Sequence, residues 1–347
     1  MIDAADDRET AASRWRRLIA ALVTLAIVDL FVPGWLAKAE RLRYDGADVF
    51  RFEYSDLFGI GPAVDYLREH PNGARPRAVF LGNSVVWGYR LRVEDSLPVQ
   101  FQRLEPSMHV LNFAVNGFGV GSAMLMAKDI VDAIDILYVH AEGGAVNPEL
   151  ARLIPVSDDD VARFQLLPPD RTERRFEDAL GFWRLYRLSY RLQAALFGTS
   201  TRNYAYTHKS ALVGGAGSGQ PVSLAPDRPI STPGALVTTM LVVSAAEPDG
   251  ERLRAIEAAE PALWECARFV QAHGKRAVFW SVASPASPDR KTTWADLNRV
   301  FQGSSVFVEL AVPPEMMIDE RHFSASGSAA VARALRAVTA SAFAAPR

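Results

Sequence analysis

The sequence predicts an α/β protein built on a doubly wound, mostly parallel five-stranded sheet that is flanked by helices. From residue 78 onward, short apolar runs alternate with longer stretches of helical periodicity, which is typical of a parallel sheet covered on both faces. The 347 residues are 49% hydrophobic and 22% charged. This composition indicates a globular chain and excludes disordered, collagen-like and polytopic membrane proteins.

Five apolar runs are the expected strands: 78–81, 110–113, 136–140, 277–282 and 306–310. Four stretches are the expected helices: 94–104, 120–133, 249–273 and 326–342. The predicted order is therefore βαβαβ, a long interruption, and then a helix, two strands and a closing helix. This pattern brings the ends of the first strands to one edge of the sheet, where open α/β sheets hold their ligands.

The N-terminus predicts a membrane anchor. Residues 1–17 form a polar tail that ends in arginines, and residues 18–36 are apolar apart from Asp29. A helix of about 20 apolar residues spans a bilayer, and basic residues before it keep that end in the cytoplasm. We expect a single-pass helix at 18–36 in the inner (cytoplasmic) membrane, with residues 40–347 on the periplasmic or extracytoplasmic side.

A cleaved signal peptide is the alternative for this segment. Pro33 and Gly34 would end the helix just before Ala37-Lys38-Ala39, a small-x-small site of the kind that signal peptidase accepts. The protein would then be secreted to the periplasm. A third interpretation is an ordinary buried N-terminal helix.

Residues 148–248 differ in composition and are expected to be an insertion into the main domain. A basic and aromatic helix is predicted at 175–198, followed by a Gly/Ser/Pro-rich loop. The helix could lie on a membrane surface, cover the active-site cleft, or pack on the core with its arginine stripe (Arg184, Arg187 and Arg191) in solvent. The loop at 214–220 lacks the Gly-Lys-Ser/Thr ending of a phosphate-binding loop and indicates a linker.

Charge and cysteine content exclude two classes of function. With 38 Lys+Arg against 40 Asp+Glu, no overall positive charge favours nucleic acid. Cys266 is the single cysteine, so the chain has neither an internal disulfide nor a cysteine-based zinc or iron–sulfur site. Cys266 lies in a helical pattern and is interpreted as a small buried hydrophobic residue.

The first candidate site residue is Ser84. It stands in Gly82-Asn83-Ser84-Val85-Val86-Trp87-Gly88, directly after the first predicted strand. This position puts a hydroxyl at the carboxyl edge of the sheet. Gly-Asn-Ser is also ordinary turn and helix-capping chemistry, so the segment alone does not establish a nucleophile.

A glycine-rich segment, 112–121, follows the second strand. Gly117 would let the backbone approach a ligand and present its N–H. A dinucleotide-binding fingerprint is the competing interpretation, with Glu142 at the distance expected for the ribose contact. The spacing opposes it, because the third glycine position would be Ser122 and the motif follows the second strand instead of the first.

The third candidate segment contains Asp319 and His322, just before the last helix. An aspartate three residues before a histidine can hold the imidazole Nδ1–H and leave Nε2 facing a nucleophile. By itself, Asp-x-x-His is more often a helix-capping turn.

Together the three segments resemble the SGNH (GDSL-like) hydrolase superfamily. Gly82 to Gly88 is similar to its Gly-Asp-Ser-x-x-x-Gly block with Asn83 in place of aspartate, and Asn112 to Gly117 is similar to its Asn-x-x-x-x-Gly block. Asp319, His322, Phe323 and Gly327 are similar to its last block. The third block, Gly-x-Asn-Asp, is altered: Asn147 comes three residues after Gly144 and no aspartate follows.

This resemblance implies an SGNH/flavodoxin-like fold and a serine hydrolase mechanism. Ser84 would be the nucleophile, His322 the general base and acid, and Asp319 the group that orients the histidine. The oxyanion hole would consist of the Ser84 and Gly117 N–H groups and the Asn147 side chain. No metal or organic cofactor is implied. The substrate would be an acylated glycan or another acyl ester.

The predicted anchor and the loss of the first-block aspartate resemble the envelope branch of the superfamily, the DltD-like and alginate-O-acetylation-like proteins. Their partner is often a membrane-bound O-acyltransferase. The sequence therefore predicts acyl transfer or ester hydrolysis on an envelope polysaccharide. Asn83 and the altered third block leave a second possibility: a catalytically degenerate SGNH-like protein that binds a glycan or such a partner.

Overall fold

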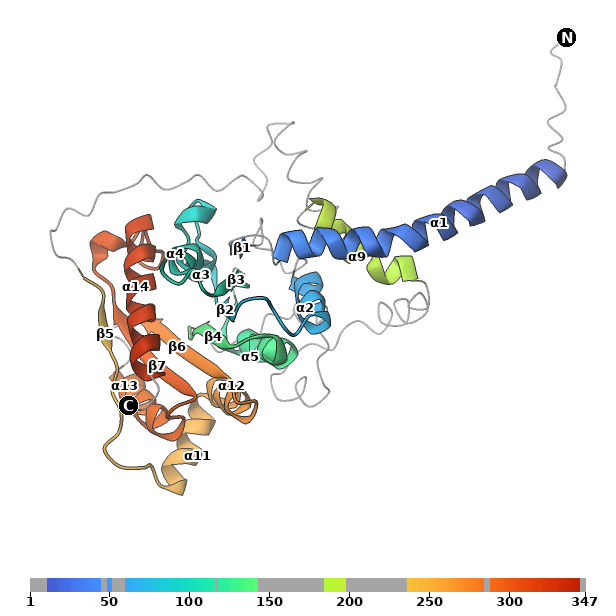
Figure 1. Ribbon diagram of the computed structural model, residues 1–347. Coiled ribbons are helices and arrows are strands. Elements are labelled where there is room, and N and C mark those ends of the chain that lie inside the picture. Colours follow the sequence, from blue (N-terminus) through green and yellow to red (C-terminus); the bar gives the residue numbers. More distant parts are fainter. Residues whose placement is uncertain are drawn as a thin grey trace, which may run out of the picture.

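The computed structural model describes residues 11–44, 49–51, 60–115, 118–142, 184–197, 236–283 and 288–343 (Figure 1). Within these ranges the strands form one sheet in the order β1-β3-β2-β4-β6-β7-β5. Every pairing is parallel except that of β5 with β7. The strands are β1 (Val49–Arg51), β2 (Arg77–Leu81), β3 (His109–Asn112), β4 (Ile136–His140), β5 (Thr238–Met240), β6 (Arg276–Val282) and β7 (Ser305–Ala311).

The predicted fold class is confirmed, and the predicted number of strands is wrong. The five expected strands are β2, β3, β4, β6 and β7, which lie side by side in the middle of the sheet. Two edge strands of three residues each, β1 and β5, were missed. In β5 two of the three residues are exposed, so no apolar run marks it. Because β5 pairs with β7, the chain rejoins the sheet before the predicted end of the insertion at residue 248.

The strand order identifies where a ligand site would lie. Numbered along the chain, the five central strands have the order 2-1-3-4-5, which is the flavodoxin-like doubly wound arrangement. The chain passes from β2 to β3 on one side and then to β4 on the other side of β2. Open sheets of this kind bind ligands outside the carboxyl ends of the two strands at this switch point, here β2 and β4.

The helices match the prediction in part. The predicted helix at 249–273 is two helices, because Pro261 has no N–H to donate and disfavours helical geometry at Glu260, where the first helix ends. Helices α2, α3 and α13 were not predicted. The helices are α1 (Ala11–Tyr44), α2 (Ile60–Glu69), α3 (Ser84–Trp87), α4 (Leu97–Leu104), α5 (Val120–Ile130), α9 (Arg184–Phe197), α11 (Gly250–Ala259), α12 (Pro261–Ala272), α13 (Pro288–Val300) and α14 (Ala325–Ala342).

Helices cover both faces of the sheet, and each face has its own apolar core (Figure 1). Alternate residues of a strand point to opposite faces: Val79 and Leu81 of β2 join the core under α2, α5 and α12, whereas Ala78 and Phe80 join the core under α4 and α14. Cys266 is fully buried in the first core, as predicted, and burial raises the pKa of its thiol to about 12.

Helix α1 is long, apolar and exposed over most of its length. It contains a stretch, Ser13–Leu42, that is long and apolar enough to cross a membrane. The predicted break at Pro33 is wrong, because the helix continues to Tyr44. One side of the helix beyond the proline, formed by Leu36, Glu40 and Tyr44, is buried, and the Tyr44 ring lies 4.9 Å from that of Tyr66 in α2. This packing against the domain offsets the hydrogen bond that Pro33 cannot donate.

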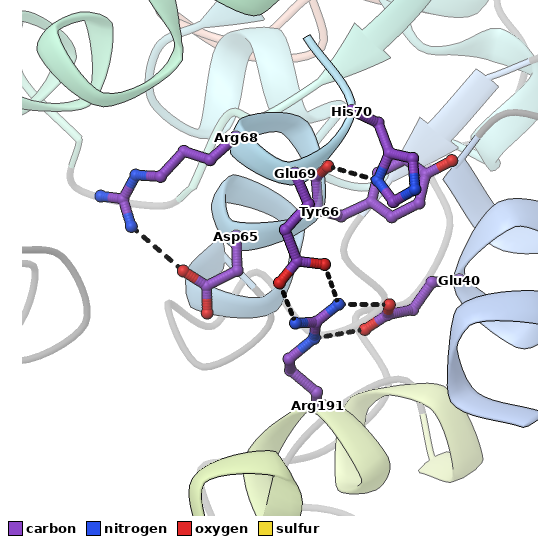
Figure 2. Close-up of polar contacts among 7 residues, drawn as sticks. All are labelled: Glu40, Asp65, Tyr66, Arg68, Glu69, His70 and Arg191. Atoms are coloured by element: carbon purple, nitrogen blue, oxygen red, sulfur yellow. Dashed lines mark hydrogen bonds and ion pairs between the residues drawn. The ribbon is translucent and has the colours of Figure 1, made fainter. Parts of the chain in front are cut away.

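An ionic cluster, formed by Glu40, Glu69 and Arg191, joins three helices (Figure 2). Arg191 of α9 donates to both carboxylate oxygens of Glu40 in α1, at 2.8 and 2.6 Å, and to both of Glu69 in α2, at 2.6 and 2.9 Å. Arg191 is 8% exposed and Glu40 is 1% exposed. Of the predicted arginine stripe, Arg191 is therefore buried and not in solvent, and α9 packs on α1 and α2.

Candidate active site

Ser84 lies where β2 ends and α3 begins. Asn83 caps this short helix: its side-chain Oδ1 accepts the Val85 N–H at 3.0 Å, and its backbone carbonyl accepts the N–H groups of Val86 and Trp87. The turn ends at Gly88, which has a φ of 89° that favours glycine. The capping role that was weighed against a nucleophile thus belongs to Asn83, and Ser84 keeps its hydroxyl for another contact.

Gly82 is required by close packing beneath this turn. A Cβ at position 82 would lie 2.6 Å from Cγ2 of Val86 and 2.8 Å from Cβ of His140. We expect Gly82→Ala to lower the free energy of unfolding by about 1–3 kcal/mol and to slow any reaction of Ser84, because the turn must shift. Gly250→Ala is the matched control, since its Cβ would meet only Arg254 Nη1 at 3.7 Å. Equal denaturation midpoints for the two variants would contradict the packing argument.

Asp319 and His322 lie in a tight loop between β7 and α14. The Asp319 Oδ1 accepts the backbone N–H groups of Arg321 and His322, each at 2.9 Å, and the His322 carbonyl accepts the Ile318 N–H at 2.7 Å. Helix α14 follows at once, capped by the Ser324 hydroxyl, which accepts the Gly327 N–H at 3.1 Å.

Gly327 packs this loop against the start of α14. A Cβ there would lie 2.1 Å from the Met316 carbonyl oxygen, a distance that no side chain tolerates. The glycine of the last predicted block is thus explained by a close approach of two backbone segments.

The structure brings Ser84, His322 and Asp319 together in a chain of hydrogen bonds. The Ser84 Oγ lies 2.9 Å from His322 Nε2, across 238 residues of sequence. His322 Nδ1 lies 2.9 Å from each carboxylate oxygen of Asp319. With hydrogen on Nδ1, the imidazole donates to Asp319 and its Nε2 accepts the serine hydroxyl, which is the geometry of a serine nucleophile with its base and orienting acid.

The surroundings keep Asp319 ionised. Burial acts to raise its pKa, but the hydrogen bonds from the Arg321 N–H and from the His322 side chain and N–H outweigh burial, so the pKa lies below its ordinary value. A carboxylate that stays charged can stabilise an imidazolium at His322. The Tyr89 ring packs against His322, with the ring centroids 4.6 Å apart.

Comparison with known proteins identified no relative. No family model, curated protein or solved structure matches the chain. The family resemblance of the sequence motifs therefore stays a hypothesis, and the site is interpreted from its own geometry.

The other residues of the predicted motifs are not part of this chain of hydrogen bonds in the described structure. Gly117 and Asn147, the other two proposed oxyanion donors, lie outside the described residues. Asn112 has a structural role: its Oδ1 accepts the Ala114 N–H at 3.1 Å beside the turn after β3. Among the described residues, no group of three or more His, Cys, Asp or Glu side chains is arranged to hold a metal ion.

Sequence reasoning missed His140 as a site residue. It is the last residue of β4, is 1% exposed, and has its Nδ1 3.2 Å from the Asn83 Oδ1. The available signal was a single histidine at the carboxyl end of an otherwise apolar strand. That signal identifies no partner, because the contact depends on the pairing of β2 with β4.

Proposed function

We propose that this protein is a serine esterase or O-acyltransferase that acts on acyl groups, O-acetyl among them, of a cell-envelope or exported polysaccharide. The observation that carries the proposal is the Ser84–His322–Asp319 chain of hydrogen bonds at the switch point of the sheet. Residues from two distant segments converge there in the order that nucleophilic acyl transfer requires.

In the first half of the proposed reaction, Ser84 Oγ attacks the carbonyl carbon of the acyl ester while its proton moves to His322 Nε2. The carbonyl π bond opens to an oxyanion, and Asp319 stabilises the imidazolium through Nδ1–H. When the tetrahedral intermediate collapses, the ester C–O bond breaks and His322 gives its proton to the leaving alcohol. The acyl group remains on Ser84.

In the second half, His322 takes a proton from the acceptor, whose oxygen attacks the acyl-serine carbonyl. Water as acceptor gives hydrolysis, and a sugar hydroxyl gives transfer. Both outcomes regenerate the Ser84 hydroxyl, and which one occurs depends on whether the cleft excludes water and positions an acceptor.

The oxyanion would be bound by hydrogen-bond donors near Ser84. The Ser84 N–H stands in the first turn of α3, where helix N–H groups have no intrahelical acceptor. Gly117 N–H and the Asn147 side chain remain proposed as the other donors. One such donor typically contributes about 100- to 1,000-fold to the rate.

Helix α1 supports the proposed location and partner. Its exposed apolar stretch supports a single-pass anchor in the inner membrane, with the catalytic domain on the periplasmic side and the tail at 1–17 in the cytoplasm. Burial of Glu40 and Tyr44 just beyond the predicted cleavage site supports an anchor that stays attached. In that position the domain is suited to receive acyl groups from a membrane-bound O-acyltransferase.

Covalent labelling tests the proposed nucleophile. We expect a fluorophosphonate probe to label the full-length chain in detergent micelles, with the modified peptide containing Ser84. Ser84→Ala should abolish labelling. Ser326→Ala should label as the wild type does, because the Ser326 hydroxyl bonds to Ser324 and not to His322. A folded wild-type chain that does not label contradicts the proposal and favours a non-catalytic binding protein.

A further inference from the structure

His140 is a buried histidine that the proposed reaction does not use. It ends β4, beside β2 at the switch point, and the register pairs Leu81 with Val139. The next positions, Gly82 and His140, therefore face each other, and only a glycine at 82 leaves room for the histidine. The ring also packs on Trp280 of β6, with ring centroids 4.4 Å apart.

The hydrogen bonds around Asn83 define which imidazole nitrogen is a donor. Asn83 Oδ1 already accepts the Val85 N–H, which fixes the orientation of the amide with its oxygen toward both groups. An oxygen cannot donate, so the 3.2 Å contact requires hydrogen on His140 Nδ1. Both the neutral and the protonated ring can carry this hydrogen.

The second imidazole nitrogen lies close to Glu142. Within the described residues, the buried His140 Nε2 has no hydrogen-bond partner, and Glu142 Oε1 lies 3.4 Å from it. The Glu142 side chain is 37% exposed. The histidine is thus held between the amide that caps the nucleophile turn and a carboxylate at the surface.

We propose that His140 is a positioning residue that holds the Ser84 turn in its reactive geometry through the side chain of Asn83. This inference rests on the proposed function of Ser84. Asn83 accepts three backbone N–H groups of α3, so the orientation of its side chain and carbonyl determines where Ser84 Oγ points. A misplacement of about 1 Å at a nucleophile can cost about 100-fold in rate.

The test compares two substitutions of His140 in the full-length chain. His140→Asn places an amide N–H near the position of Nδ1 and preserves the donor, whereas His140→Leu fills similar space without one. We expect His140→Leu to slow fluorophosphonate labelling of Ser84 and the kcat of a soluble ester by about 10- to 100-fold, with KM unchanged. His140→Asn should stay within about threefold of the wild type, because the hydrogen bond remains.

A thermal double-mutant cycle tests the contact without any activity. We expect His140→Leu to lower the melting temperature by about 2–4 °C in the wild-type background and by much less in the Asn83→Ala background. Additive shifts would overturn the proposed contact. Equal labelling rates for His140→Leu and wild type, or equal slowing by both His140 variants, would overturn the positioning role. A folded wild type that does not label refutes the proposed function instead.

Discussion

Replacing His322 with alanine is expected to lower ester turnover by about 10,000-fold or more, because among the described residues it is the base in contact with the Ser84 hydroxyl. The described structure places a single imidazole nitrogen, Nε2 of His322, in hydrogen-bond contact with the Ser84 hydroxyl. The measurement is the hydrolysis rate of p-nitrophenyl acetate by the full-length chain in detergent. Since the two residues act as a unit, the Ser84→Ala/His322→Ala double variant should be no slower than either single variant.

His273→Ala is the control for this experiment. His273 is exposed and follows the last residue of α12 as its C-cap, and its Nδ1 lies 2.8 Å from the Phe269 carbonyl oxygen. We expect this variant to hydrolyse the ester at the wild-type rate. A His322→Ala variant that keeps more than a tenth of the wild-type rate would show that Ser84 is activated by another base or not at all.

Breaking the ionic cluster is expected to cause the largest loss of stability. Arg191→Met should lower the free energy of unfolding by about 3–5 kcal/mol, because it leaves the Glu40 carboxylate buried without a partner. The free energy is measured by urea denaturation in detergent, followed by tryptophan fluorescence. The double variant Glu40→Met/Arg191→Met should recover most of the loss, since Glu69 is 52% exposed and returns to water.

Arg336→Met is the matched control for Arg191→Met. Arg336 of α14 pairs with Glu105 at 2.5 Å, but its side chain is 52% exposed. An exposed ion pair of this kind contributes at most about 1 kcal/mol. If Arg191→Met and Arg336→Met have the same effect, the cluster is not the link that fixes α1 and α9 to the domain.

The cluster gives α1 a defined orientation relative to the sheet domain. Helix α2, which carries Glu69, leads directly into β2, and β2 ends at the Ser84 turn. One buried guanidinium thus joins α1, α2 and α9, and the chain continues from α2 to β2 (Figure 2).

Sequence motifs predicted the three residues of the hydrogen-bonded chain because their segments, each ambiguous alone, together resemble one family pattern. Ser84 follows an apolar strand in a glycine-flanked turn, and the spacing of Asp319 and His322 is set by a short loop. Asn83 stands where the family pattern has an aspartate, and from the sequence it is a departure from that pattern. In the structure it is the cap that holds α3, with an amide oxygen shared between Val85 and His140.

The sequence by itself determined the α/β class, the five central strands and the exposed apolar helix, because these depend on local periodicity and on the length of apolar runs. Only the tertiary structure decided which polar side chains contact one another. Arg191, Glu40 and Glu69 look like surface charges along the chain, and His140 looks like the end of a strand. Their roles depend on contacts between segments that are far apart in sequence, and local periodicity carries no information about such pairing.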